Sequence, residues 1–137
     1  RARMELGGGW LGWVISVADL APYEARLERQ AVTGTRHFPD GRRLEWRQIG
    51  VKGLIADPQL PYFVSWVSDE DVRPSALQGE IKLTKLEIAG NQQRVADWLG
   101  TDVPETFDGV EIDFVSESGY PGLDAVTFAT ANGDVRI

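Results

Sequence analysis

The feature that most constrains the fold is a weak internal repeat. A strand-like segment, residues 13–19, leads into a stretch with helical spacing, and residues 83–89 do the same. The matched positions are Ile15 with Leu86, Val17 with Ile88, and Ala18 with Ala89. Further strand-like segments follow each copy. The order predicts two consecutive βαβββ modules, and hence an α+β chain.

The first half contains signals for a helix and for a hairpin. Asp19 is placed to cap a helix that runs to about Arg29, with Pro22 in its first turn. Asp40-Gly41 is a pair typical of hairpin turns. The strands expected here are residues 9–17, 35–38, 43–49 and 61–67.

The second half contains a clearer helix. Asn91 suits its N-cap, Val95, Trp98 and Leu99 form an apolar stripe, and Gly100 suits a left-handed C-cap. The strands expected here are residues 81–89, 110–115 and 123–129, and a last one after the Asn132-Gly133 turn.

Length and composition indicate one compact domain over residues 1–137. The chain has 137 residues, 42% of them hydrophobic, which is enough for a continuous core. We expect a module at 9–68, a connector at 69–79 and a module at 80–137, because the region between the halves is acidic, contains proline and lacks periodicity.

Composition also limits the partners and the compartment. The sequence has no cysteine, which excludes disulfides and thiolate sites and fits a reducing cytoplasm. Its net charge of −7 disfavours nucleic acid. It has no apolar run of about 18 residues, so we expect no membrane span. The N-terminal residues lack the apolar run of a signal peptide.

Several segments resemble the glyoxalase-like branch of the vicinal-oxygen-chelate superfamily, which includes the glyoxalases, bleomycin resistance proteins and dioxygenases. They are 9–13, 36–41, 44–48, 60–63, 86–90 and 121–133. The resemblance implies bacterial proteins in which two modules form a half-open, barrel-like sheet with helices on the convex side. The concave side holds a small ligand and, in the enzymes, a divalent metal.

The metal ligands that the resemblance implies are missing from this sequence. The corresponding positions are Gly12, Ser65, Leu83 and one residue of 135–137, and none is His, Asp or Glu. Such metals need several of these donors together, so we predict no metal and no cofactor. Proteins of this branch often carry a further module, beginning with an Asp-His pair, ahead of the Gly-Trp strand. A segment outside these residues could therefore supply the ligands.

Strand alternation indicates which side chains face the concave side. It turns Trp13, Ile15 and Val17 toward the first helix, with Val64 and Trp66, and leaves Phe63 and Ser65 on the concave side. It turns Thr84, Leu86 and Ile88 toward the second helix and leaves Lys85 and Glu87 on the concave side. Alternation does not settle which side of the strand carries Trp46 and Gln48 and which side carries Glu45 and Arg47. The ligand-binding candidates are Trp10, Arg36, Trp46, Arg47, Gln48, Phe63, Ser65, Lys85 and Glu87.

Four arginines concentrate positive charge on the predicted hairpin. Arg42 and Arg43 lie at its turn, where a solvated role is the simpler reading, whereas Arg36 and Arg47 could bind a ligand's carboxylate or phosphate. An inward Arg47 would need a carboxylate, for which Glu87 is the internal candidate. His37, the single histidine, lies near the hairpin tip, and we assign it no catalytic role.

Three functions are compatible with these features. The first is metal-independent small-molecule binding, or a degenerate glyoxalase-like protein, with an aromatic and polar pocket. The second is a metal-dependent lyase, isomerase or dioxygenase whose ligands come from a missing segment or a partner chain. The third is an oligomerisation module, such as a homodimer, without a ligand. No nucleophile motif indicates a catalytic residue.

Overall fold

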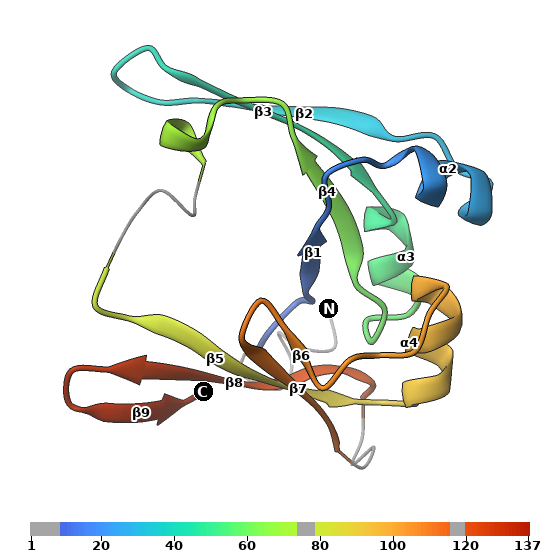
Figure 1. Ribbon diagram of the computed structural model, residues 1–137, viewed down its shortest axis with the longest axis vertical. Coiled ribbons are helices and arrows are strands. Elements are labelled where there is room, and N and C mark those ends of the chain that lie inside the picture. Colours follow the sequence, from blue (N-terminus) through green and yellow to red (C-terminus); the bar gives the residue numbers. More distant parts are fainter. Residues whose placement is uncertain (1–8, 74–78, 116–119) are drawn as a thin grey trace. The chain divides into compact units, whose positions relative to one another are not determined.

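The computed structural model describes residues 9–73, 79–115 and 120–137, which form an α+β fold (Figure 1). The elements, in order, are β1 (Val14–Ser16), α2 (Ala21–Leu27), β2 (Val32–His37), β3 (Arg43–Ile49), α3 (Val51–Ala56), β4 (Tyr62–Trp66), the 3-10 helix η1 (Glu70–Val72), β5 (Lys82–Ala89), α4 (Gln92–Leu99), β6 (Thr106–Phe107), β7 (Val110–Val115), β8 (Gly122–Thr130) and β9 (Gly133–Arg136).

The strands form two mixed sheets that stay open. The first has the order β1-β4-β3-β2 and the second the order β6-β7-β5-β8-β9. In each sheet the leading strand, β1 or β5, runs parallel to one neighbour, and the other pairs are antiparallel. The prediction of an α+β chain with two βαβββ modules is confirmed.

The strongest local signals gave the most accurate boundaries. Asn91 is the N-cap of α4, and its side chain accepts a hydrogen bond from the Arg94 amide at 3.2 Å. Gly100 ends the helix with a φ of 78°. The predicted turns are also present, because Gly41 and Gly133 have φ values of 89° and 107°.

Other boundaries were wrong. The N-cap of α2 is Leu20, and Asp19 instead accepts a hydrogen bond from the Ala21 amide at 3.0 Å. The helix ends at Leu27 because Glu28 adopts a left-handed conformation with a φ of 52°. The first strand has three residues, β2 begins at Val32, and α3 and β6 were not predicted.

The chain forms two compact units that alternate along the sequence. The first-sheet unit combines Val14–Lys52 with the described part of Tyr62–Gln78. The second-sheet unit combines the described parts of residues 1–13 and Gly79–Ile137 with Gly53–Pro61. The segment before β4 therefore belongs to the second-sheet unit, although it lies within the predicted first module.

Each unit has its own apolar core. Leu20, Ile49 and Phe63 are fully buried in the first-sheet unit, and Ile88 and Val95 are fully buried in the second. No helix in the described ranges is long and apolar enough to span a membrane.

Candidate functional site

The first sheet has one face that packs on α2. The Phe63 ring lies 4.4 Å from the Tyr23 ring of α2, and Phe63 is 1% exposed. The Ser65 hydroxyl donates to the Ala18 carbonyl, just before this helix, at 3.1 Å. The prediction that Phe63 and Ser65 point away from the helix was wrong, because β4 has the opposite parity.

Arg47 also lies on the face that packs on α2. It stands opposite Ser65 in the β3–β4 ladder, and its guanidinium lies 3.6 Å from the Glu24 carboxylate of α2. Its side chain is 47% exposed. The expected partner, Glu87, instead pairs with Arg136. The carboxylate that answers Arg47 in this structure is thus Glu24 rather than Glu87.

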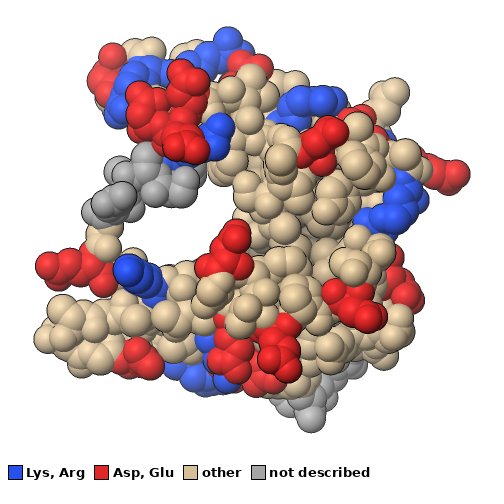
Figure 2. Space-filling model, viewed as in Figure 1, with Lys and Arg blue, Asp and Glu red and all other residues tan. Residues whose placement is uncertain are grey.

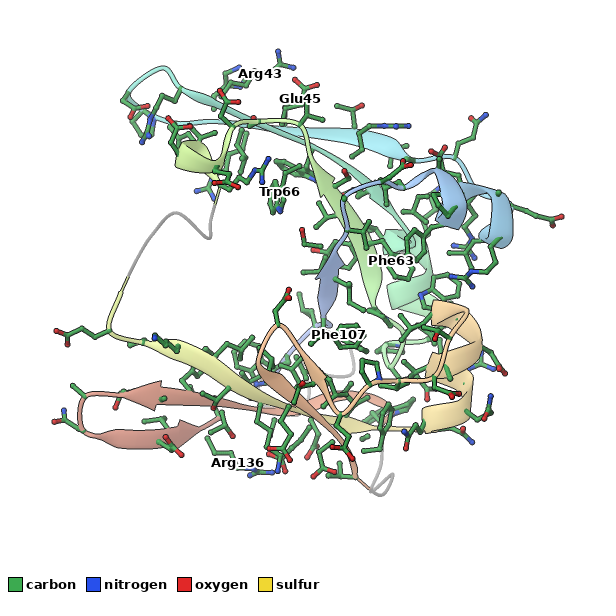
Figure 3. The ribbon with its side chains drawn as sticks, in the orientation of Figure 1. Arg43, Glu45, Phe63, Trp66, Phe107 and Arg136 are labelled. Atoms are coloured by element: carbon green, nitrogen blue, oxygen red, sulfur yellow. The ribbon has the colours of Figure 1, made fainter. Side chains whose placement is uncertain are left out.

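Two tryptophans lie on the other face of the first sheet. Trp46 and Trp66 are directly opposed on β3 and β4, so they share a face, and their ring centroids are 6.2 Å apart in an edge-on arrangement. Figure 3 shows Trp66 and Phe63 pointing to opposite sides of this sheet. We call the side with Trp46, Trp66 and Gln48 the aromatic face. Placing Val64 and Trp66 on the helix side was therefore wrong, whereas Ile15 lies there as predicted.

A glycine allows the Trp46 indole to lie against the edge strand. Gly34 is the ladder partner of Trp46, and a Cβ added there would lie 2.3 Å from the indole Cε2. That distance is far below van der Waals contact. The close approach of the ring to the backbone is thus possible only without a side chain at position 34.

A hydrogen bond to Gln48 also holds the Trp46 indole in place. The Trp46 indole N–H donates to Gln48 Oε1 at 2.8 Å. An indole N–H can only donate, so it determines which end of the amide is the oxygen. The Gln48 Nε2 group is then the end directed away from Trp46.

The hairpin arginines differ in their partners. Arg42 pairs with Asp40 at 2.7 Å and Arg43 with Glu45 at 3.2 Å, and Arg47 pairs with Glu24. Basic and acidic side chains accordingly lie together around this hairpin (Figure 2). Arg36 has no carboxylate partner among the described residues, and its guanidinium lies 5.8 Å from the Phe38 ring.

The turn adds one electrostatic effect. The backbone N–H of Arg42 donates to Asp40 at 3.0 Å, and the Arg42 guanidinium lies beside the same carboxyl. Both interactions favour the ionised form and lower the pKa of Asp40 below its ordinary value.

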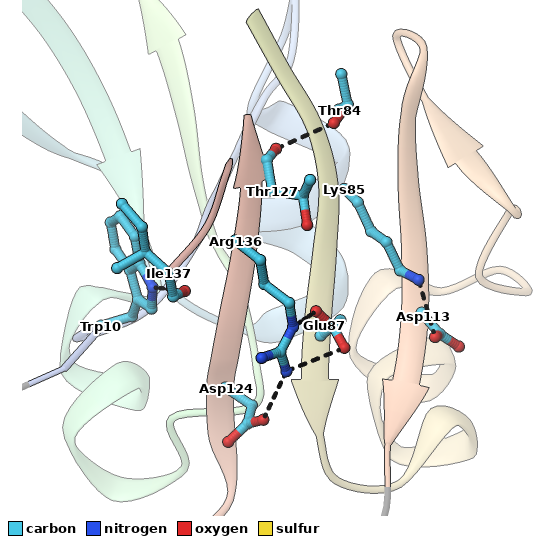
Figure 4. A network of polar contacts seen from close by, with 9 residues as sticks. All are labelled: Trp10, Thr84, Lys85, Glu87, Asp113, Asp124, Thr127, Arg136 and Ile137. Atoms are coloured by element: carbon cyan, nitrogen blue, oxygen red, sulfur yellow. Dashed lines mark hydrogen bonds and ion pairs between the residues drawn. The ribbon is translucent and has the colours of Figure 1, made fainter. Parts of the chain in front are cut away.

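Lys85 and Glu87 lie on the second sheet, where charged side chains pair across strands. Leu86 and Ile88 are buried, so Lys85 and Glu87 point to the other side of β5, as the alternation predicted. Lys85 lies 3.4 Å from Asp113 (Figure 4).

The Glu87 carboxylate is held from two strands away. Arg136 reaches it at 2.6 Å and lies 3.9 Å from Asp124, and the pairing with Glu87 raises the pKa of Arg136. These charges therefore pair with one another across β5, β8 and β9.

Trp10 lies with the second-sheet unit. Its ring centroid is 6.4 Å from that of Phe128 on β8, and its indole N–H donates to the Ile137 carbonyl at 2.9 Å. The ligand-binding candidates are therefore divided between two units, and only Arg36, Trp46 and Gln48 share the aromatic face.

The positions expected for metal ligands do not form a donor set. Ser65 is engaged with a backbone carbonyl and Leu83 is an exposed apolar side chain. Within the ranges that the structure describes, no three His, Cys, Asp or Glu side chains converge as a metal site would require.

A comparison with known protein families identifies the family of the chain. The model of the glyoxalase-like domain matches residues 1–103. The chain belongs to the glyoxalase-like domain family. No curated protein matches the sequence.

One solved structure with the same fold resembles this glyoxalase-like domain. It is a hypothetical protein from Staphylococcus aureus, with a TM-score of 0.53 and 12% sequence identity. The match covers 98% of this chain and 54% of that protein. The glyoxalase-like chain thus spans about half the length of this neighbour, and the likeness concerns the fold alone.

Sequence reasoning missed two residues of the aromatic face of this glyoxalase-like domain. Trp66 was assigned to the wrong side because both Phe63 and Val64 in its strand are buried, so the strand has no polar face. Gly34 had a usable signal, since an isolated glycine in a strand often marks a close approach of another group.

Proposed function

We propose that this glyoxalase-like domain binds a small organic molecule on the aromatic face of its first sheet, without a metal ion. The observation that carries the proposal is the Trp46–Trp66 pair on the side of the sheet opposite α2, with the Gln48 amide beside it.

This combination has the chemistry of a small-molecule site. Such sites are lined by aromatic and apolar side chains and contain a few fixed polar groups that orient the ligand. Two indoles at an angle offer a ring face and a ring edge, and favourable aromatic contacts contribute about 0.5–1.5 kcal/mol each beyond their burial. The Gln48–Trp46 hydrogen bond and Gly34 hold one indole in place, which lowers the entropic cost of binding.

The test is intrinsic fluorescence of the full chain titrated with 2-naphthol, a neutral bicyclic probe. Stacking on Trp46 or Trp66 should change their emission, and Trp66→Ala should weaken binding by about tenfold, the equivalent of one favourable ring contact. Trp10→Phe is the matched control, because Trp10 belongs to the other unit. Equal effects of the two variants would reject the aromatic face as the site.

The alternative is a metal-dependent lyase, isomerase or dioxygenase whose ligands come from outside these residues. This alternative is supported by the resemblance of the chain to a superfamily that includes metalloenzymes. Thermal unfolding with and without Zn, Ni, Mn or Fe separates the two proposals. Metal bound well below its added concentration would stabilise the protein by several kcal/mol, about 2.7 kcal/mol at a hundredfold excess over Kd. We expect no such rise, and a rise that a chelator removes would favour the metalloenzyme.

A further inference from the structure

We infer that β9 is an interface that pairs with β9 of a second copy of this chain, with a twofold axis at Val135. This inference does not depend on the aromatic face, which belongs to the other unit. β9 is the last strand of its sheet (Figure 1), and all four of its residues are exposed. An edge strand leaves one row of backbone N–H and C=O groups unpaired, and another strand can add there.

The hydrogen bonds to β8 determine which backbone groups of β9 face outward. The Ile137 backbone donates to Val126 at 2.8 Å and accepts from it at 2.9 Å. Bonded and non-bonded pairs alternate along an antiparallel ladder, so the backbone of Val135 is also bonded to β8. The backbone groups of Asp134 and Arg136 therefore point away from β8, at the open edge.

One antiparallel register of two β9 strands satisfies both these backbone groups and the charges. With the axis at Val135, Asp134 lies opposite Arg136 of the second copy, so each pair joins opposite charges and can form two backbone hydrogen bonds. An axis at Asp134 would oppose two aspartates, and an axis at Arg136 would oppose two arginines, which is unfavourable. An axis between two residues would set the outward groups against groups already bonded to β8.

The apolar side chains of this edge fit the same register. Leu83, Phe128 and Val135 form one row across β5, β8 and β9, and Ile137 lies on the same face as Val135. Val135 is 45% exposed and Ile137 is 64% exposed. With the axis at Val135, the two valines form a non-hydrogen-bonded pair, in which side chains are closest. Ile137 lies beside Gly133 of the second copy, which has no side chain to exclude it. The second copy therefore covers these exposed apolar groups.

The charges on the opposite face select a second copy as the partner. Asp134 forms no ion pair with another residue of the described ranges. Arg136 uses Nε and Nη2 to reach Glu87, at 2.6 and 3.3 Å. A guanidinium has five N–H donors, so Arg136 can also bind a carboxylate across the edge. Charges on an edge strand disfavour pairing with most strands, but these two match their own reversed sequence.

The experiment measures self-association of the full chain. Because β9 has four residues, the interface is small and we expect a weak dimer. Sedimentation velocity at protein concentrations up to about 1 mM should show a monomer–dimer equilibrium. In the same concentration series, NMR hydrogen exchange of the Asp134 and Arg136 backbone amides should become slower, because these amides gain acceptors only in the dimer.

Two charge variants test the register. Asp134→Lys and Arg136→Glu each oppose like charges in both pairs, and each should raise the dissociation constant of the dimer at least about tenfold. An equimolar mixture of the two variants restores opposite charges in both pairs and should associate about as tightly as the wild type. Asp102→Lys is the matched control, because it makes the same charge change at an exposed position of the same unit.

Circular dichroism of each variant checks its fold, since Arg136→Glu also removes the ion pair with Glu87. Asp134→Lys removes no ion pair between described residues, so it tests the inference by itself. A monomer at every concentration would overturn the inference, and so would a dimer that Asp134→Lys does not weaken more than Asp102→Lys. Amides of Asp134 and Arg136 that exchange equally fast, or equally slowly, at all concentrations would also reject β9 as the interface. Failure of two folded variants to associate when mixed would reject the axis at Val135.

Discussion

At the scale of single residues, Gly34 determines where the Trp46 indole lies. A methyl group at position 34 would lie 2.3 Å from the ring, so Gly34→Ala must displace it. Because the indole is only half-buried, it can move outward. We expect the free energy of unfolding to decrease by about 1 kcal/mol, the low end of the range for overpacking. Near-UV circular dichroism and urea unfolding measure the ring environment and the free energy of unfolding.

Thr33→Ala is the control for this prediction. Thr33 is the neighbouring residue of the same edge strand, but it stands opposite Arg47 and hence points away from Trp46. It should leave the near-UV spectrum unchanged. An unchanged spectrum in Gly34→Ala as well would mean that the indole does not lie on β2.

Asp40 gives a prediction about pH. Its pKa is lowered chiefly by the backbone N–H of Arg42, which Arg42→Ala retains. In an NMR titration, the pKa of Asp40 should therefore stay below its ordinary value in this variant. Since the folded pKa is depressed, the stabilising contribution is present above the ordinary pKa and is lost as pH falls through the folded value. Complete return of the pKa in Arg42→Ala would assign the effect to the guanidinium.

The direction of side chains was predictable only where a strand has one polar face. In β5, charged Lys85 and Glu87 alternate with buried Leu86 and Ile88, and their side was predicted correctly. In β4, Phe63 and its neighbour Val64 are both buried, so alternation could not choose a side. The ladder with β3 decides it, and that register depends on residues distant in sequence.

At the scale of elements, helix boundaries were predictable where capping residues mark them. Asn91 and Gly100 define α4, and both were identified. Segment Val51–Ala56 contains Gly53 and has no acidic residue in its first turn, and α3 was missed. Residue propensities were a weak guide to this helix, as they generally are when the tertiary context decides.

The start of α4 depends on a buried glutamine from another part of the chain. Gln59 Oε1 accepts the Asn91 backbone N–H at 2.8 Å, and its Nε2 donates to Asp57 at 2.7 Å. Asp57 in turn pairs with Arg94 of the helix. Gln59 is the buried polar side chain of this region and holds the loop before β4 against α4.

Replacing Gln59 by leucine should destabilise the protein. The Asn91 N–H would lose its acceptor, and a polar group left unsatisfied on burial costs about 1–3 kcal/mol. Chemical denaturation measures the loss. Gln92→Ala, an exposed change in the first turn of the same helix, should stay within about 0.5 kcal/mol of the wild type. A similarly small effect of Gln59→Leu would mean that water replaces its hydrogen bonds.

At the scale of the whole molecule, the sequence repeat predicted the order of elements but not the grouping of their contacts. The boundary between repeats was placed at 69–79, where composition changes. The second-sheet unit also contains residues 9–13 and Gly53–Pro61, which precede that boundary. Nothing in a periodic pattern indicates this, because these residues are joined by side-chain hydrogen bonds to backbone groups, such as Trp13 to the Gln59 carbonyl at 2.9 Å.

The last prediction is that residues 80–137 do not fold as an independent module. Without the preceding chain, the Trp98 indole N–H loses its acceptor, the Pro61 carbonyl, at 2.7 Å. Asn91 loses Gln59, and Arg94 loses Asp57. With eight residues, α4 is too short to be stable from propensity alone. The amide groups of α4 should therefore exchange faster in the isolated fragment than in the intact chain.

Adding residues 1–79 as a second fragment provides the control, because it restores all three partners at once. Mixing the two fragments should recover slow exchange in α4. If α4 in the isolated fragment is as well protected as in the intact chain, residues 80–137 are a self-sufficient module. The hydrogen bonds from residues 57–61 would then contribute little to its stability.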